Sequence, residues 1–475
     1  MIDVHTLHDA PNRHVHDAPA PTRLQSDPDA PRPLRLNRLS VRGLPTVPAL
    51  EDCIRCGLCL SVCPTYRPTG VEGDSPRGRI ALVKAQVEAK IDPDAPAFQE
   101  HMDLCLQCMA CHSVCPTDVN AGAVVASQKA YMHATRPRAT RQWLLYHLVF
   151  KGLFPHYDRL ELATAPLRLY KRSGLRWLAR RSELMKRLPG PLWLMEALLP
   201  DRVGRPARGR IPAVTPPSGP VKRRADGRPL RVAFHLCCMN NVLFPDACVA
   251  SVRVLARNGA EVVTPKNITC CGAPHETEGE MELGRALARQ NIARYERLGV
   301  DYVVTDAAAC GAVFKHYGHW LERDARWRER AERFSARVRD IHEFLIEVGL
   351  ELPEQPVRAR VTYDDPCHLC HAQRIGVQPR EILHAIPGLD YVELPEASWC
   401  CGSAGTYNIT QPEMAETILK DKVDHIRGTG AAVIASANPG CMLQLEAGLR
   451  RHGVPGKVRH VIELLDEAYG YGESR

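Results

Sequence analysis

The sequence predicts an α/β protein with a small α+β part, in which a helical N-terminal domain precedes two duplicated α/β domains. Two cysteine runs repeat in the first third, the C-terminal half repeats itself around further cysteines, and both halves alternate β-branched runs with helical segments. The chain has 475 residues, of which 45% are hydrophobic and 24% charged. This size and composition are typical of a multidomain globular protein.

The first duplication pairs two four-cysteine runs at a constant offset of 52 residues. Both runs have the spacing C-x2-C-x2-C-x3-C-P, in which three thiolates hold one iron–sulfur cluster and the fourth completes its neighbour. The sequence therefore predicts a ferredoxin-type domain with two [4Fe–4S] clusters. One would be held by Cys53, Cys56, Cys59 and Cys115, and the other by Cys105, Cys108, Cys111 and Cys63. A structural zinc site leaves the third cysteine and the terminal Cys-Pro of each run unexplained.

The second duplication relates the segment RVAFHLCC (231–238) to RVTYDDPC (360–367). Two Cys-Cys-Gly triplets, at 270–272 and 400–402, and two later cysteines follow in the same order. The runs 231–236, 260–265 and 302–307 read as short buried strands, and the segments between them have helical spacing. Strand–helix alternation predicts one parallel α/β layer in each half.

These repeats offer a second candidate site, in which thiols meet at strand-to-helix turns. Its members are Cys238 (or Cys237), Cys270, Cys271 and Cys310 in the first half, and Cys367, Cys400, Cys401 and Cys441 in the second. Such groups could bind an additional iron–sulfur cluster or zinc, or carry out dithiol redox chemistry. The alternative is that they are buried packing thiols. We interpret Cys248 and Cys370 as incidental, and the nearby His275, His368 and His371 as polar packing.

Composition divides the chain into six parts. We expect a disordered leader over 1–45, the two-cluster domain over 46–135, a basic helical connector over 136–200 and a Pro/Arg-rich linker over 201–229; the duplicated domains would span 230–350 and 358–470. Residues 136–231 contain 22 Lys and Arg against 6 Asp and Glu, and 141–154 and 190–199 are typical of amphipathic helices. This basic region could contact an anionic membrane surface or an acidic partner, or be a solvated connector.

Several classes of protein are excluded or disfavoured by the sequence. The sequence contains no uninterrupted run of the about 18–20 apolar residues that are needed to span a bilayer. The N-terminus also lacks the apolar core of a secretory signal. We therefore expect a cytoplasmic protein, with the inner face of the cell membrane as the alternative location. No nucleic-acid-binding module is recognisable. No G-x-G-x-x-G follows a strand, so neither FAD nor NAD is expected on this chain.

The segments around these cysteines closely resemble the iron–sulfur subunit of glycolate oxidase (glycolate dehydrogenase). The resemblance covers about residues 50–470 and is most specific in SPRGRI (75–80) and CCGSAGTYN (400–408). Relatives with paired cysteine-rich (CCG) domains include subunits of glycerol-3-phosphate dehydrogenase, lactate-utilisation complexes and heterodisulfide reductase. In heterodisulfide reductase the CCG motif ends in C-x2-C. The corresponding segments of this chain, DAAACG and NPGCM, keep only one cysteine each.

The resemblance implies a division of labour between subunits. FAD-containing dehydrogenase subunits would oxidise glycolate or a related 2-hydroxy acid, and this subunit would pass the electrons toward a quinone or another acceptor. The isolated chain would then lack the substrate-oxidising site and any catalytic residue of its own. The resemblance also favours Cys238 over Cys237. The alternatives are the iron–sulfur subunit of a D-lactate or glycerol-3-phosphate dehydrogenase, or a thiol–disulfide reductase.

Overall fold

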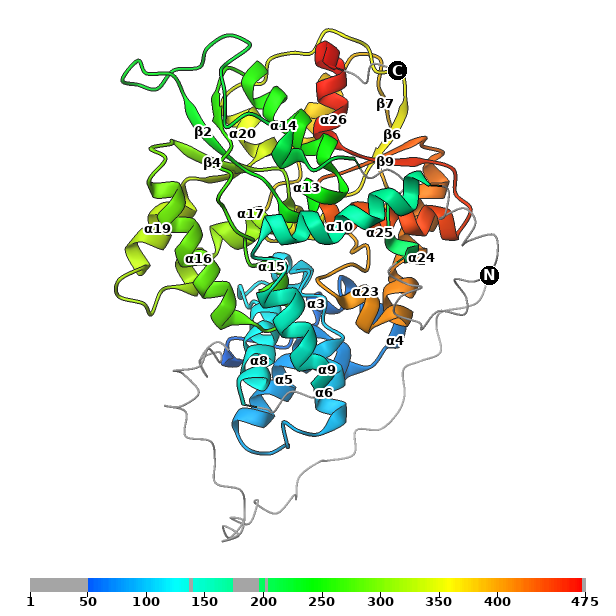
Figure 1. Ribbon diagram of the computed structural model, residues 1–475. Coiled ribbons are helices and arrows are strands. Elements are labelled where there is room, and N and C mark those ends of the chain that lie inside the picture. Colours follow the sequence, from blue (N-terminus) through cyan, green and yellow to red (C-terminus); the bar gives the residue numbers. More distant parts are fainter. Residues whose placement is uncertain (1–49, 136–139, 174–195, 201–203, 472–475) are drawn as a thin grey trace, which may run out of the picture.

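The computed structural model describes residues 50–135, 140–173, 196–200 and 204–471, and the predicted leader over 1–45 lies outside these ranges. A small helical domain packs beneath two α/β domains that lie side by side (Figure 1). The predicted order, a helical domain followed by two duplicated α/β domains, is therefore confirmed.

The N-terminal domain consists of short helices around the cysteine runs. Its elements are α3 (Leu58–Ser61), α4 (Tyr66–Thr69), η2 (Glu72–Asp74), α5 (Pro76–Val87), α6 (Pro96–Asp103), α7 (Ala110–Ser113) and α8 (Ala121–Thr135). Helices α5, α6 and α8 enclose a core that includes Ile80, Val83, Phe98, Met102 and Val125. Burial of these apolar side chains stabilises the domain, which is small and has little other surface to bury.

The connector is helical where it is described. It contains α9 (Thr140–Leu145), the π-helical segment η3 (Tyr146–Lys151) and α10 (Tyr157–Arg172). Phe150 is buried, whereas Trp143, Leu144 and Leu148 are at least half exposed. The predicted helix over 141–154 is thus formed. Most of the predicted helix over 190–199 lies outside the described residues.

The stretch predicted as a Pro/Arg-rich linker, 201–229, packs on the first α/β domain from residue 204 onward. Its strand β1 (Val214–Thr215) pairs antiparallel with β3 (Glu261–Val263), and Ala207 in η5 (Ala207–Gly209) is fully buried. The composition of this stretch hid the pairing, because a two-residue edge strand has no hydrophobic alternation of its own.

The first α/β domain has a five-stranded sheet in the order β1-β3-β2-β4-β5. Its remaining strands are β2 (Arg231–His235), β4 (Tyr302–Thr305) and β5 (Val338–Asp340), and all pairings except that of β1 are parallel. Its helices are α13 (Cys238–Leu243), α14 (Pro245–Arg257), α15 (Ala273–Thr277), α16 (Met281–Glu296), α17 (Ala308–Lys315), α18 (Tyr317–Trp320), α19 (Arg328–Ala336) and α20 (Ile341–Glu347). The three predicted strands coincide with β2, β3 and β4.

The second α/β domain repeats this arrangement with a four-stranded parallel sheet in the order β7-β6-β8-β9. Its strands are β6 (Arg360–Tyr363), β7 (Asp390–Tyr391), β8 (Val433–Ser436) and β9 (Lys457–His460). Its helices are α21 (Cys367–Cys370), α22 (Gln378–Ala385), α23 (Tyr407–Thr410), α24 (Pro412–Thr429), α25 (Pro439–Arg451) and α26 (Val461–Asp466), followed by η6 (Glu467–Tyr471). Because β6 and β2 occupy equivalent places, the duplication inferred from the sequence is structural.

The two α/β domains share one hydrophobic core. Helix α26 packs against α14 of the first domain, and α20 packs against α22 of the second. Each of the two exchanged helices begins with a capping box, at Asp340 and at His460, which satisfies the backbone N–H groups left free in its first turn. The exchange joins the two domains, so their cysteine-bearing turns are held in a fixed relation.

Candidate metal centres

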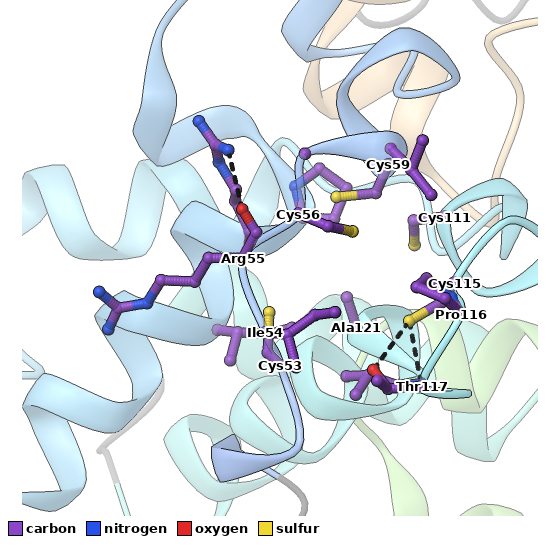
Figure 2. Close-up of a pocket in the computed structure, with 16 residues that line it drawn as sticks. Cys53, Ile54, Arg55, Cys56, Cys59, Cys111, Cys115, Pro116, Thr117 and Ala121 are labelled. Atoms are coloured by element: carbon purple, nitrogen blue, oxygen red, sulfur yellow. Dashed lines mark hydrogen bonds between the residues drawn. The ribbon is translucent and has the colours of Figure 1, made fainter.

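The first cysteine-lined cavity brings together Cys53, Cys56, Cys59 and Cys115 (Figure 2). Cys111 also reaches this cavity, and Ile54, Leu58, Ile80 and Val119 contribute apolar lining. Cys56 is exposed, whereas Cys53, Cys59 and Cys115 are partly buried. The structure therefore places the fourth cysteine of the second run beside the first three cysteines of the first run.

The second cavity gathers the complementary set, Cys63, Cys105, Cys108 and Cys111. Cys63 and Cys108 are buried, and Arg79 and Gln107 line the cavity together with apolar side chains. The two cavities are adjacent, because Cys111 lines both. The duplicated runs thus exchange their fourth thiols in space, the arrangement expected from the spacing.

Backbone geometry repeats between the two loops as closely as their spacing does. Arg55 and Gly57 have positive φ in the first loop, and Gln107 and Met109 have positive φ at the equivalent places in the second. A left-handed residue after the second cysteine reverses the chain before α3 and α7. This winding brings three thiols of each run to one cavity.

In each Cys-Pro-Thr segment the threonine hydroxyl contacts the sulfur of the fourth cysteine. Thr65 Oγ1 lies 3.3 Å from Cys63 Sγ, and Thr117 Oγ1 lies 3.5 Å from Cys115 Sγ. Burial tends to raise the pKa of the Cys115 thiol, but hydrogen bonds from Thr117 and from the Val119 N–H outweigh it, so the pKa is lowered. A lowered thiol pKa favours the thiolate, which is the form that binds metal.

The segment SPRGRI starts helix α5 between the two cavities. Ser75 caps the helix by accepting a hydrogen bond from the Gly78 N–H at 2.9 Å. A Cβ atom on Gly78 would lie 1.8 Å from the Glu72 carbonyl oxygen, so only glycine fits there. Arg77 donates to the Arg55 carbonyl on the first loop, and Arg79 turns inward to the second cavity. One helix N-terminus therefore braces both cysteine loops.

The donor chemistry of both cavities fits iron–sulfur clusters. All ligand candidates are thiols, which are the donors that iron–sulfur clusters take. Burial strongly raises the pKa of the Cys108 and Cys111 thiols, and the neighbouring thiols raise it further. Four thiolates can share such an apolar site only when a cationic centre compensates their charge.

In the first α/β domain five buried thiols meet where β2 and β4 end. Cys237 contacts Cys238 and Cys310, Cys270 contacts Cys238 and Cys271, and Cys271 contacts Cys310. Hydrogen bonds from neighbouring thiols lower the pKa of Cys237 and of Cys270, and raise those of their partners Cys238 and Cys310. The preference for Cys238 over Cys237 is therefore not reproduced by the structure, which brings both into the group.

The second α/β domain brings together its four predicted cysteines. Contacts run from Cys367 to Cys400, from Cys400 to Cys401 and from Cys401 to Cys441. Behind them, the fully buried Lys422 donates to Asp364 at 3.0 Å and to the Ala397 carbonyl at 2.7 Å. Within the described ranges, no three His, Cys, Asp or Glu side chains are arranged to hold a single metal ion.

The four cysteines of the second α/β domain, here called the second thiol group, lie against the ferredoxin-type domain. Cys108 is close enough to Cys367 and Cys400 for their charges to interact. Around them Leu106, Trp399 and Tyr407 form one apolar cluster with these cysteines, and the Tyr407 hydroxyl donates to the Leu104 carbonyl at 3.0 Å. A continuous series of thiols therefore connects the two cavities with the second α/β domain.

The three histidines beside the thiols make polar contacts with backbone carbonyls, a serine and the thiols themselves. His275 Nε2 lies 2.9 Å from the Phe150 carbonyl oxygen, and its ring lies near Cys270, whose thiol acts to raise the pKa of His275. His371 bridges Ser113 of the ferredoxin-type domain and the Ser398 carbonyl. His368 Nδ1 lies 3.5 Å from Cys367 Sγ.

Three further residues of these sites were not singled out from the sequence. Tyr157 donates to the Leu236 carbonyl beside the first thiol group at 2.5 Å, and Lys422 and Arg79 are buried cations. Cys237, predicted only as the alternative to Cys238, completes that thiol group. A single arginine or lysine within a charged helix carries no sequence signal for burial.

Family models match the N-terminal domain, the connector and both α/β domains. The "4Fe-4S dicluster domain" matches residues 49–119, and the "Cysteine-rich domain" matches 232–315 and 361–446. The model "Glycolate oxidase iron-sulfur subunit, linker region" matches 141–199. Fold and thiol sites together define an iron–sulfur protein that joins a dicluster domain to two cysteine-rich domains.

Whole-chain relatives narrow this class. The "Probable glycolate oxidase iron-sulfur subunit" of Bacillus subtilis (strain 168) is 39% identical over 90% of this chain and 95% of its own. The "Glycolate oxidase iron-sulfur subunit" of Escherichia coli (strain K12) is 30% identical over 91% and 97%. A subunit of the fumarate reductase (CoM/CoB) of Methanothermobacter marburgensis is 29% identical over 88% and 72%. The chain belongs to the glycolate oxidase iron–sulfur subunit family, whose role is electron transfer.

None of the helices in the described ranges is long and apolar enough to cross a membrane.

Proposed function

We propose that this chain accepts electrons from FAD-containing subunits that oxidise glycolate or a related 2-hydroxy acid, and passes them toward a quinone or another acceptor. The proposal is supported by the family and by the thiol-lined cavities, which supply sites for electron carriers. The hydride step then belongs to the partner subunits, and this chain is the electron-transfer part of the oxidoreductase.

Eight cysteines would hold the two [4Fe–4S] clusters. Cys53, Cys56, Cys59 and Cys115 would bind the first, and Cys63, Cys105, Cys108 and Cys111 the second. Such clusters supply one-electron transfer. The residues of this chain hold them in adjacent cavities that share Cys111 as lining, which shortens the path between them.

The CCG cysteines would continue this path. The thiol group of Cys367, Cys400, Cys401 and Cys441 lies beside Cys108, whereas that of Cys237, Cys238, Cys270, Cys271 and Cys310 lies on the side of Tyr157 and His275. Either group meets the first requirement of an additional iron–sulfur cluster, a set of thiols brought together. Zinc, the alternative occupant, would require the thiols to rearrange, because no three His, Cys, Asp or Glu side chains of the described residues are arranged to hold a single ion. The second group is placed to exchange electrons with the ferredoxin-type domain.

Replacing Cys108 by serine tests this path in the assembled complex. Mixed with the flavoprotein subunits, the unmodified chain should restore glycolate-dependent reduction of a quinone analogue. Cys108→Ser should reduce that rate to background, because it removes a ligand at the contact with the second thiol group. Cys370→Ser is the matched control, since Cys370 lies next to Cys367 in the fold yet bonds only backbone carbonyls; its rate should be unchanged. An unmodified chain that binds the flavoproteins without restoring the rate would contradict the proposal.

A thiol–disulfide reductase is the second candidate, favoured by the contiguous buried thiols of each CCG domain. The iron–sulfur subunits of D-lactate and glycerol-3-phosphate dehydrogenases remain alternatives that differ only in the partner's substrate. Disulfide reduction by the isolated chain with a one-electron donor, lost in Cys401→Ser, would select the reductase.

We also propose a peripheral contact of the connector with the inner face of the cell membrane. Trp143, Leu144 and Leu148 expose apolar surface in a strongly basic part of the chain, which suits an anionic bilayer. Binding to vesicles with phosphatidylserine should exceed binding to neutral vesicles, and should weaken when Trp143 and Leu148 are both replaced by serine. Equal sedimentation with both vesicle types would contradict the contact.

A further inference from the structure

Arg79 is the buried cation of the ferredoxin-type domain that faces a cluster cavity. Its side chain is 2% exposed and lines the cavity of Cys63, Cys105, Cys108 and Cys111. A guanidinium group stays charged at all accessible pH values. Burying this group costs free energy unless its charge is compensated. A buried charge beside four thiols therefore needs a functional explanation.

A short chain of hydrogen bonds links this guanidinium to a ligand sulfur. Arg79 donates from Nη2 to Thr65 Oγ1 at 3.1 Å, and Thr65 Oγ1 lies 3.3 Å from Cys63 Sγ. Arg79 Nε is fixed by the His101 carbonyl at 2.7 Å. The Thr65 hydroxyl donates to the Asp74 carbonyl at 2.9 Å. When Cys63 is a thiolate, that hydrogen can turn to the sulfur instead, while the Thr65 oxygen still accepts from Arg79.

Asp74 balances this cation incompletely. Its carboxylate is 4.0 Å from Arg79, beyond hydrogen-bond distance, and bonds instead to His101 Nδ1 at 2.8 Å. Of this pair, Arg79 lines the cavity of the cysteines and Asp74 does not. In a buried site of low dielectric, such a charge acts strongly on its surroundings.

The other cavity lacks this arrangement at the equivalent place. Thr117 repeats the position of Thr65 and contacts Cys115 Sγ, but Thr117 is exposed to solvent and lies beside Asp118. Arg77, the arginine on that side of α5, binds the Glu72 carboxylate and the Arg55 carbonyl at the surface. The duplicated loops are thus alike in their thiols and different in their buried charge.

We propose that Arg79, acting through Thr65, is a positioning residue that raises the reduction potential of the cluster held by Cys63, Cys105, Cys108 and Cys111. Reduction adds one negative charge to a cluster, and a nearby buried cation stabilises that charge; hydrogen bonds to the sulfurs and net charge are the known means by which proteins tune such clusters. The inference rests on the proposed pair of [4Fe–4S] clusters and adds the residue that makes them unequal.

Reduction potentials of the full chain, followed by electron paramagnetic resonance during a dithionite titration, test this role. Arg79→Gln should move the potential of one cluster to more negative values and leave the other in place. Asp74→Asn should move the same cluster in the opposite direction, because it removes the counter-charge. Thr65→Val should give a smaller negative shift, whereas the matched variant Thr117→Val should move only the other cluster. Arg79→Lys keeps the charge, so the potential of its cluster should lie between the potentials measured for Arg79→Gln and for the unmodified protein.

A merely structural role of Arg79 and Asp74 would not shift the cluster potential in opposite directions in Arg79→Gln and Asp74→Asn. Shifts of the same sign, or none, in variants that keep both clusters would overturn the inference. If Arg79→Gln fails to assemble its cluster, the Asp74→Asn and Thr65→Val variants decide the question. Iron and acid-labile sulfide in the unmodified chain are measured first, so that absence of the clusters, which would defeat the proposed function, is distinguished from absence of a shift.

Discussion

Combining Cys56→Ser with Cys63→Ser should abolish both clusters, whereas combining Cys56→Ser with Cys115→Ser should abolish only one. Anaerobically prepared protein should hold about eight irons from the two cysteine runs, falling to about four in the second variant and to almost none in the first. The reason is the exchange of fourth thiols: Cys56 and Cys115 line one cavity, and Cys63 lines the other. Iron and sulfide analysis of the purified variants gives the measurement.

The two double variants are matched controls for each other, because each removes one loop thiol and one thiol that precedes a proline. If each run of four cysteines held its own cluster, the results would be reversed, with Cys56→Ser/Cys63→Ser keeping half of the iron. Any iron bound at the CCG cysteines adds equally to both variants, so the difference between them remains readable.

The cysteine groups were predictable from the sequence because spacing limits where thiols can lie. Three cysteines within seven residues share one loop, and the fourth cysteine of each run, before a proline, is expected to complete the other cluster, which brings the two loops together. The α/β layers were predictable for a similar reason: β2, β3 and β4 are short β-branched runs between helical segments, a pattern that belongs to parallel sheets.

The features that escaped prediction depend on contacts between distant segments. β1 becomes a strand only because β3 offers it an edge. Helices α20 and α26 cross to the other domain, which no local pattern records. Arg79 and Lys422 look like ordinary helix-surface cations in the sequence, and only the fold shows that each is buried beside thiols. Charge burial is a property of tertiary packing, so a single sequence gives no account of it.

Lys422 lies fully buried beneath the second thiol group and pairs with Asp364, which is 1% exposed. Burial alone would lower the pKa of Lys422, but the Asp364 carboxylate and the nearby Cys400 and Cys401 more than offset this effect and raise it. The group is therefore charged at neutral pH. The first α/β domain has the neutral, buried Asn291 on its corresponding helix, bonded to the Cys270 carbonyl, so the buried ion pair distinguishes the second thiol group.

Lys422→Met should reduce the free energy of unfolding by about 3–5 kcal/mol, because it leaves the Asp364 carboxylate buried without its counter-ion. Chemical unfolding of the anaerobic protein, followed by circular dichroism, measures the loss. Lys420→Met on the same helix is the control: Lys420 is 60% exposed and pairs with Asp424 at the surface, so its loss should be well below 1 kcal/mol. The double variant Asp364→Asn/Lys422→Met should recover much of the stability, since the introduced amide would keep a polar group for Ser436, which bonds Asp364 in the unmodified chain, without an unpaired charge. Equal losses from Lys420→Met and Lys422→Met would mean that the buried pair contributes no more than a surface one.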